Sequence, residues 1–173
     1  MSSGKELTYP QHLELMSLPL SDGVDASDCG LDSQWRVLNT SLVLGWGDEC
    51  FEQAVERLFS FSAHRFAGVN VTGTAAEGEV LRLNFGPTRS PCLVLRAERT
   101  SPSRAFLIYG TLPGHVERGE EAFIIDKDAQ GRVVGRCVAF SQHAWWLAKL
   151  GAPVARAVQN RITCLYLQGM RGD

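Results

Sequence analysis

Between residues 35 and 66, the spacing of apolar residues predicts one strand followed by one amphipathic helix. Residues 35–44 mix β-branched and aliphatic side chains with polar ones, as strands commonly do. Asp48 stands where a helix N-cap belongs, and apolar residues then recur every three or four positions up to about Phe66. His64 falls outside this apolar face, so the pattern predicts that its side chain faces solvent.

Beyond Gly68 the apolar residues change from helical spacing to alternation, which predicts a series of strands. Short segments rich in glycine, proline, serine and aspartate separate these strands and are typical of turns. The predicted strands are 69–74, 80–85, 92–98, 105–112, 121–127 and 133–140. Because the connections are too short for helical crossovers, neighbouring strands are expected to be antiparallel.

The C-terminal segment from residue 141 to about residue 167 carries one apolar stripe of helical period. Ser141 is placed as the N-cap of this helix. Pro153 interrupts the segment, but the stripe continues in phase on both sides, which predicts a bend rather than two separate helices. Trp146 lies on the flank of the stripe, whereas Trp145 lies nearly opposite it.

The order of these elements predicts an α+β fold of the helix-grip type. A curved antiparallel sheet of about seven strands would wrap around the long C-terminal helix, whose apolar stripe covers the inner face of the sheet. Such an arrangement often leaves a cavity between sheet and helix. Residues 34–173 are assigned to this single domain, and residues 1–33 to an irregular N-terminal lead-in that is partly mobile.

One glycine-rich connection, in the sequence YGTLPGHVERGEEAF at residues 109–123, concentrates titratable side chains. A histidine beside a partly desolvated carboxylate can transfer protons near neutral pH, so His115, Glu117, Glu120 and Glu121 are the candidate catalytic residues. The alternative is a tight turn whose charges are solvated or paired. Adjacent Glu120 and Glu121 would point to opposite faces of a strand, so at most one of them points inward.

Four further positions are candidate ligand-binding residues: Tyr109, Phe140, Trp146 and Arg161. The three aromatic residues are expected to form walls of the cavity. Arg161 shares a helical face with the apolar stripe, so its charge must reach solvent or find an anionic partner. Two alternatives stay open for Arg161, namely an anionic group of a ligand and an ion pair with Glu120 or Glu121.

Composition limits the classes of function. The formal net charge of −2 gives no sign of nucleic acid or an anionic membrane as a partner. The five cysteines are scattered without a C-x-x-C pair, which indicates a reducing compartment rather than a disulfide framework or a zinc site. There is no apolar signal-peptide core, and no run approaches the ~20 apolar residues of a membrane span, so a cytoplasmic location is predicted.

Known cofactor and catalytic motifs do not occur. The chain has no nucleophile elbow, no dinucleotide-binding glycine motif and no phosphate-binding loop with its lysine. The spacing of His115, Glu117 and Glu120 differs from that of a helical zinc site. No metal and no cofactor is therefore predicted, and the expected partner is a small hydrophobic molecule.

Several motifs resemble landmarks of the domain-of-unknown-function 1990 family. They are residues 109–123, the VAFS segment at 138–141, WLAKLGAPVAR at 146–156, LTYP at 7–10 and AHRFAG at 63–68. The chain departs from the family pattern between residues 11 and 34. The resemblance implies a START-like fold, of the SRPBCC superfamily typified by the birch pollen allergen, and it brings no established activity.

Three functions are compatible with these predictions. The first is a protein that binds a small, mostly apolar metabolite in the cavity between the sheet and the C-terminal helix. The second is a biosynthetic enzyme, for instance a cyclase, isomerase or hydratase, that uses the same cavity with histidine and glutamate as acid and base. The third is an interaction module whose cavity is filled by side chains. Oligomeric state is left open.

Overall fold

The computed structural model describes residues 6–143 and 152–172, and within them seven strands form one antiparallel sheet. The strand order is β1-β7-β6-β5-β4-β3-β2. The strands are β1 (Arg36–Trp46), β2 (Asn70–Thr72), β3 (Val80–Phe85), β4 (Thr88–Ser101), β5 (Arg104–Thr111), β6 (Glu117–Lys127) and β7 (Arg132–His143). The short connections thus produce the antiparallel neighbours that the sequence predicted.

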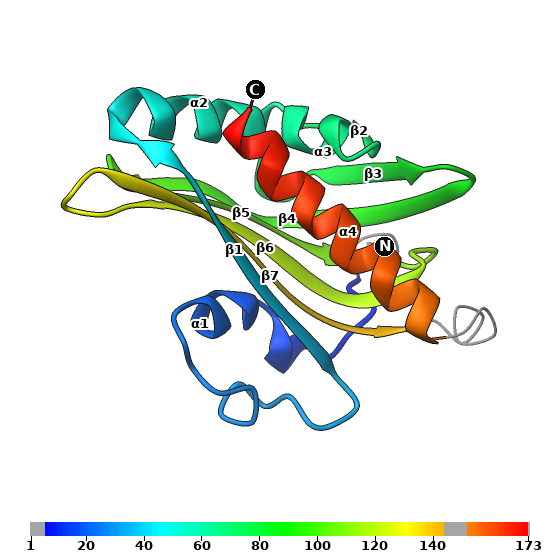
Figure 1. Ribbon diagram of the computed structural model, residues 1–173. Coiled ribbons are helices and arrows are strands. Elements are labelled where there is room, and N and C mark those ends of the chain that lie inside the picture. The colour runs from blue at the N-terminus through cyan, green and yellow to red at the C-terminus, as the bar shows by residue number, and fades with distance from the viewer. Residues whose placement is uncertain (1–5, 144–151, 173) are drawn as a thin grey trace.

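Helices cover both faces of this sheet (Figure 1). The face that carries α2 (Gly47–Phe59), α3 (Ser62–Phe66) and the long α4 (Ala152–Arg171) is called the helix face. The opposite face carries the 3-10 helix η1 (Gln11–Leu13) and α1 (Ser17–Ser21) and is called the lead-in face. The predicted α+β, helix-grip architecture is therefore confirmed.

The central strands are buried on both faces, and neighbouring residues face different cores. On β6, Phe123 and Ile125 belong to the core under the helices, whereas Ile124 belongs to the core under the lead-in. On β5, Leu107 and Phe106 divide in the same way. Burial of each such side chain contributes about 1.5–3 kcal/mol. Two-sided burial also means that adjacent polar residues on these strands enter two separate environments.

The segment predicted as an irregular lead-in, residues 1–33, contains η1 and α1 in its described part. Leu13, Leu20 and Leu31 are almost fully buried, and they share a hydrophobic core with the lead-in face of the sheet. The periodicity was too short to predict these elements, because a helix of five residues has no complete apolar repeat. These two short helices are stabilised by packing against the sheet.

The single helix predicted between Asp48 and Phe66 is wrong, because the structure has two helices there. Phe61, between α2 and α3, adopts a left-handed conformation with φ of 59°. This residue changes the phase of the helix, so a helical wheel drawn through it misplaces everything that follows. His64, predicted to face solvent, is fully buried.

The start of the predicted C-terminal helix is also wrong. Residues up to His143 continue β7, so Ser141 is a strand residue rather than a helix cap. The described part of the C-terminal helix, α4, includes Pro153, but the bend predicted at this proline involves residues 144–151, which the structure does not describe. Residues 144–151, which include Trp145 and Trp146, lie outside the described part of the chain.

Close contact between α3 and α4 positions the aromatic residues of the helix face. A Cβ at Gly169 of α4 would lie 2.8 Å from the backbone oxygen of Ala63 and 2.9 Å from its Cα. Only glycine therefore permits this approach. It brings Tyr166 of α4 beside His64 of α3, with ring centroids 4.7 Å apart.

Candidate functional site

A cavity of about 470 Å³ lies between the sheet and α4. Phe85 of β3 and Val158 of α4 line it while being 40% and 43% exposed, so the cavity opens to solvent between apolar side chains. The lining is Val69, Leu83, Phe85, Pro87, Thr88, Ser90, Tyr109, His115, Val116, Glu117, Glu121, Val158, Gln159, Ile162, Thr163 and Tyr166. The aliphatic walls come mainly from the β2–β4 side of the sheet and from α4.

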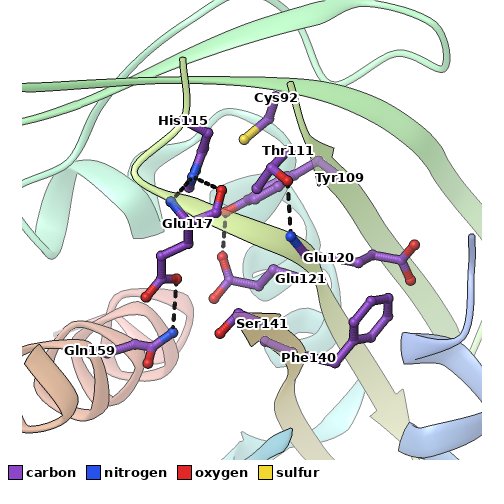
Figure 2. Close-up of a pocket in the computed structure, with 12 residues that line it drawn as sticks. Cys92, Tyr109, Thr111, His115, Glu117, Glu120, Glu121, Phe140, Ser141 and Gln159 are labelled. Atoms are coloured by element: carbon purple, nitrogen blue, oxygen red, sulfur yellow. Dashed lines mark hydrogen bonds between the residues drawn. The ribbon is translucent and has the colours of Figure 1, made fainter. Parts of the chain in front are cut away.

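The two glutamates and the histidine of the cavity lie at the side formed by β5 and β6. Tyr109, His115, Glu117, Glu121 and Gln159 also line an adjoining hollow of about 50 Å³. In Figure 2, the Gln159 amide reaches from α4 toward Glu117 of β6, and its Nε2 donates to Oε2 over 3.1 Å. The cavity therefore combines apolar walls with one polar side, which is the usual composition of a small-molecule site.

Three buried side chains form a hydrogen-bonded chain at this polar side. The Tyr109 hydroxyl donates to Oε2 of Glu121 over 2.8 Å, and Nε2 of His64 lies 3.1 Å from the same hydroxyl oxygen. Cys137 also donates its S–H to Oε1 of Glu121 at 3.4 Å. Burial raises the pKa of Glu121 to about 7, against these hydrogen bonds, which lower it. Glu121 can therefore change protonation near neutral pH.

His64 is neutral in this series of hydrogen bonds, and its tautomer follows from the partners of the Tyr109 hydroxyl. When Glu121 is ionised it can only accept, so the Tyr109 hydroxyl donates to it and Nε2 of His64 donates to the Tyr109 oxygen. Its Nδ1 is then an acceptor, and it has no hydrogen-bond partner among the described residues. Burial, and secondarily the charge of Arg65, lowers the pKa of His64 to about 3. Sequence periodicity missed this residue, and its place in the AHRFAG motif was the only signal for it.

His115 lines the cavity together with Glu117 and Glu121, and its ring contacts the backbone of Glu117. Its Nδ1 lies 2.9 Å from the backbone nitrogen and 3.1 Å from the backbone oxygen of Glu117, so it can accept from the first or donate to the second. Burial lowers the pKa of His115 to about 4. The imidazole is thus neutral at pH 7 and holds the turn that precedes β6.

Glu120 does not line the cavity, contrary to its prediction as a candidate catalytic residue. It borders only the adjoining hollow, and its side chain extends away from Glu121 (Figure 2). Its carboxyl lies on the lead-in face, where it accepts hydrogen bonds from Tyr9 Oη at 2.8 Å, Leu15 N at 2.8 Å, Ser17 N at 3.0 Å and the Ser17 hydroxyl. Burial raises the pKa of Glu120, and these four donors oppose the shift. The expectation that only one of Glu120 and Glu121 points inward is confirmed.

Gly119 precedes the two glutamates and allows a close approach between β6 and β7. Its φ of 150° lies in the range that favours glycine, and a Cβ there would lie 1.9 Å from the backbone oxygen of Phe140. Its N–H donates to the Thr111 hydroxyl over 2.9 Å. The glycine therefore lets β6 pass close to β7 immediately before Glu120 and Glu121.

Of the four predicted ligand-binding residues, Tyr109 lines the cavity and Phe140 borders only the adjoining hollow. The Phe140 ring packs edge-on against Tyr9 and Trp35 on the lead-in face, with centroids 5.5 and 5.4 Å apart. Arg161 is exposed, and in the described residues it makes no ion pair with Glu120 or Glu121. The predicted ion pair with Glu120 or Glu121 is therefore wrong, because the Arg161 side chain lies in solvent. Trp146 lies outside the described residues.

The described residues contain neither a cluster of metal ligands nor a membrane-spanning helix. No three histidine, cysteine, aspartate or glutamate side chains among residues 6–143 and 152–172 gather closely enough to hold a metal ion. No helix in the same part of the chain is both long and apolar enough to cross a membrane.

The sheet, the helix laid across it and the cavity between them define a helix-grip protein with the START-like fold. The chain belongs to the family described as "Domain of unknown function (DUF1990)", which matches residues 22–169. The resemblance seen in the sequence motifs is thus confirmed, and the family description assigns no activity.

Two UPF0548 proteins are similar to this chain in sequence. A UPF0548 protein of Deinococcus radiodurans is 30% identical over 134 residues, which cover 68% of this chain and 68% of that protein. A UPF0548 protein of Dictyostelium discoideum is 45% identical over 60 residues, but these span only 31% of this chain and 28% of that protein.

Solved structures share the fold at very low sequence identity. The hypothetical protein jhp0584 of Helicobacter pylori has a TM-score of 0.62 at 11% identity, covering 98% of this chain and 96% of that one. The major latex-like protein 151 of Panax ginseng has a TM-score of 0.55 at 9% identity, with coverages of 80% and 97%. At such identities the likeness shows the fold alone.

Proposed function

We propose that this protein binds a small, mostly apolar molecule in the cavity between the sheet and α4. The observation that carries the proposal is the open cavity of about 470 Å³, whose surface is mainly apolar and whose two glutamates and histidine lie at one side. Its volume falls within the range of small-molecule sites, roughly 300–1,000 Å³. The exposed apolar side chains at its opening give a ligand direct access.

The cavity argues against the interaction module with a filled interior. Protein interiors are close-packed, and spaces much larger than a water molecule are few in a domain of this size. An opening with Phe85 40% exposed and Val158 43% exposed costs solvation free energy unless something covers it. A bound apolar molecule would cover these side chains.

The proposal predicts that filling the cavity abolishes binding. Val158→Trp places an indole at the cavity opening, and we expect it to weaken binding of the neutral fluorescent probe N-phenylnaphthylamine by at least about tenfold. Binding is measured by the rise in probe fluorescence on titration with protein.

Val24→Trp is the matched control, because Val24 is 42% exposed and lies in the lead-in, away from the cavity. It should bind the probe as wild type does. Equal probe affinity in Val158→Trp and Val24→Trp, with both variants folded, would contradict the proposal.

A second candidate function is an enzyme that uses Glu121 as a general acid or base in the same cavity. The specific observation is that Glu121, with a pKa of about 7, lies on the cavity and is hydrogen-bonded to Tyr109, which is in turn held by His64. An acid–base catalyst works best with a pKa near the working pH. Glu121 thus takes the acid–base role that was predicted for His115, and isomerisation, cyclisation or hydration are reactions it could serve.

The enzyme alternative makes its own prediction. For any compound that wild type both binds and converts, Glu121→Gln should retain affinity within about fivefold while conversion falls by about 10²–10⁴-fold, the usual contribution of a general acid or base. Conversion is followed by mass spectrometry of the compound. Unchanged conversion by Glu121→Gln would exclude this role for the carboxyl.

We also propose that the protein works in the cytoplasm. Cys29, Cys50, Cys92, Cys137 and Cys164 are all free thiols. Free thiols persist in a reducing compartment, which supports this location.

A further inference from the structure

The charged side chains that line the cavity in the described part of the chain are acidic. Glu117 and Glu121 line it, whereas no lysine or arginine does so among the described residues. His115 also lines it, but with a pKa lowered by burial to about 4 its imidazole is neutral at pH 7. The polar side of the cavity therefore offers negative potential to whatever enters it.

Glu121 has hydrogen-bond donors but no cation among the described groups that face it. Those groups are Cys92 of β4, Tyr109 of β5, Glu117 of β6, Cys137 of β7 and Tyr166 of α4. His64, one step further away, is neutral and fully buried. A carboxylate in apolar surroundings without a counterion is costly, and one well-placed cation would offset much of that cost.

The hydrogen bonds that the Glu121 carboxyl receives leave it able to accept more. His64 donates to the Tyr109 oxygen, and this directs the Tyr109 hydrogen to Oε2 of Glu121. Oε1 receives only the weak S–H donor of Cys137 at 3.4 Å. An ionised carboxylate has about four lone-pair positions, so places for two further donors remain.

We infer that the ligand of this cavity carries a basic amine, whose ammonium group pairs with Glu121 while its apolar body lies between the sheet and α4. The inference rests on the proposed function and names the chemical class of the ligand. An ammonium group supplies both the missing charge and the missing donors, whereas an alcohol supplies only a donor. A carboxylate ligand would meet Glu117 and Glu121 with like charge. The rings of Tyr109 and Tyr166, which also line the cavity, favour a cation further.

The test compares three probes with one apolar body: phenylbutylamine, phenylbutanol and phenylbutyrate. Affinity is measured by isothermal titration calorimetry with the full chain at about pH 8, where Glu121 is ionised. We expect the amine to bind at least about tenfold more tightly than the alcohol, and the carboxylate to bind more weakly than both. Glu121→Gln should remove the preference for the amine and leave affinity for the alcohol unchanged, and Glu77→Gln, at an exposed position, should change neither.

A second readout separates ion pairing from burial of the apolar body. Because the ammonium pairs with the ionised form of Glu121, the amine affinity should fall by up to about tenfold per pH unit below pH 7. The alcohol should show no such fall, and neither should the amine with Glu121→Gln. Calorimetry in buffers of different ionisation enthalpy should also detect protons released when the amine binds near pH 6.

Each outcome decides a different point. Equal affinity of wild type for amine and alcohol, or tightest binding of the carboxylate, would overturn the amine inference while the cavity proposal stands. An amine preference that survives Glu121→Gln would overturn the assignment of Glu121 as the anchor. Failure of all three probes to bind would overturn the amine inference together with the proposed function.

Discussion

Replacing Glu121 by glutamine is expected to stabilise the fold at pH 8 and to remove part of its pH dependence. Burial raises the pKa of this carboxyl from 4.5 to about 7 in the folded state. The folded protein therefore holds a proton on Glu121 that the unfolded chain has released between these pH values. Stability must then fall as pH rises through this window. With about 1.4 kcal/mol per pKa unit, the loss from Glu121 is up to about 3 kcal/mol above pH 7.

The measurement is urea unfolding of wild type and Glu121→Gln from about pH 4 to pH 8. Glutamine keeps an oxygen for the Tyr109 hydroxyl but does not ionise, so the difference between the two proteins isolates the titration of Glu121. Other groups with shifted pKa values, such as Glu120 and His115, contribute to both proteins alike. Parallel stability curves for the two proteins would contradict the raised pKa.

Such a stabilising substitution would itself support a functional role for the carboxyl. Residues retained at a cost to stability are common in binding and catalytic sites. In the apolar cavity Glu121 has that property, because its ionisation at neutral pH weakens the fold. A bound amine would reverse this cost, so phenylbutylamine should raise the stability of wild type more than that of Glu121→Gln.

Replacing Glu120 by alanine is expected to lower the free energy of unfolding by about 3 kcal/mol, although this residue neighbours Glu121. The substitution leaves the Tyr9 and Ser17 hydroxyls and the backbone N–H groups of Leu15 and Ser17 without their acceptor. Each buried donor left unpaired costs about 1–3 kcal/mol. The total stays below the sum for the four donors, because the lead-in can detach and its donors then bind water. Urea unfolding measures the loss, and limited proteolysis should show faster cleavage within residues 6–33.

Two controls define the effect of Glu120→Ala. Tyr9→Phe removes one of the donors and leaves the carboxyl with the others, so its cost through this hydrogen bond should be smaller, about 1 kcal/mol. Glu77→Ala alters an exposed glutamate and should have little effect. Because Glu120 faces the lead-in, probe binding in the cavity should persist in the folded variant. Unfolding of Glu120→Ala at the same urea concentration as Glu77→Ala would show that the lead-in is held by other contacts.

Most elements of the sheet could be predicted because alternation is a local property. The predicted strand 80–85 coincides with β3, and the other strands differ from their predictions mainly at the ends. Hydrogen bonds to neighbouring strands extend β4 to Ser101 and β7 to His143, and local composition does not show where such pairing stops. The same uncertainty placed Ser141 in the predicted helix, whereas it belongs to β7.

In the candidate site, too, the sequence predicted local features, whereas packing decided the rest. The sequence predicted that Glu120 and Glu121 separate to opposite faces, because neighbours on a strand always do. Which of them faces the cavity depended on the lead-in, whose Tyr9, Leu15 and Ser17 surround Glu120. The position of Phe140 on the lead-in face followed from the same packing.

By itself, the sequence determined the class of the fold, the strand succession and the loop that carries the acidic residues, since periodicity and turn composition act over a few neighbouring residues. Only the tertiary structure decided that His64 joins Tyr109 and Glu121. That contact joins residues 45 positions apart, and it depends on the left-handed Phe61 that turns α3 inward. Burial then sets the pKa values of Glu121 and His64, because desolvation arises only when distant segments pack around a side chain.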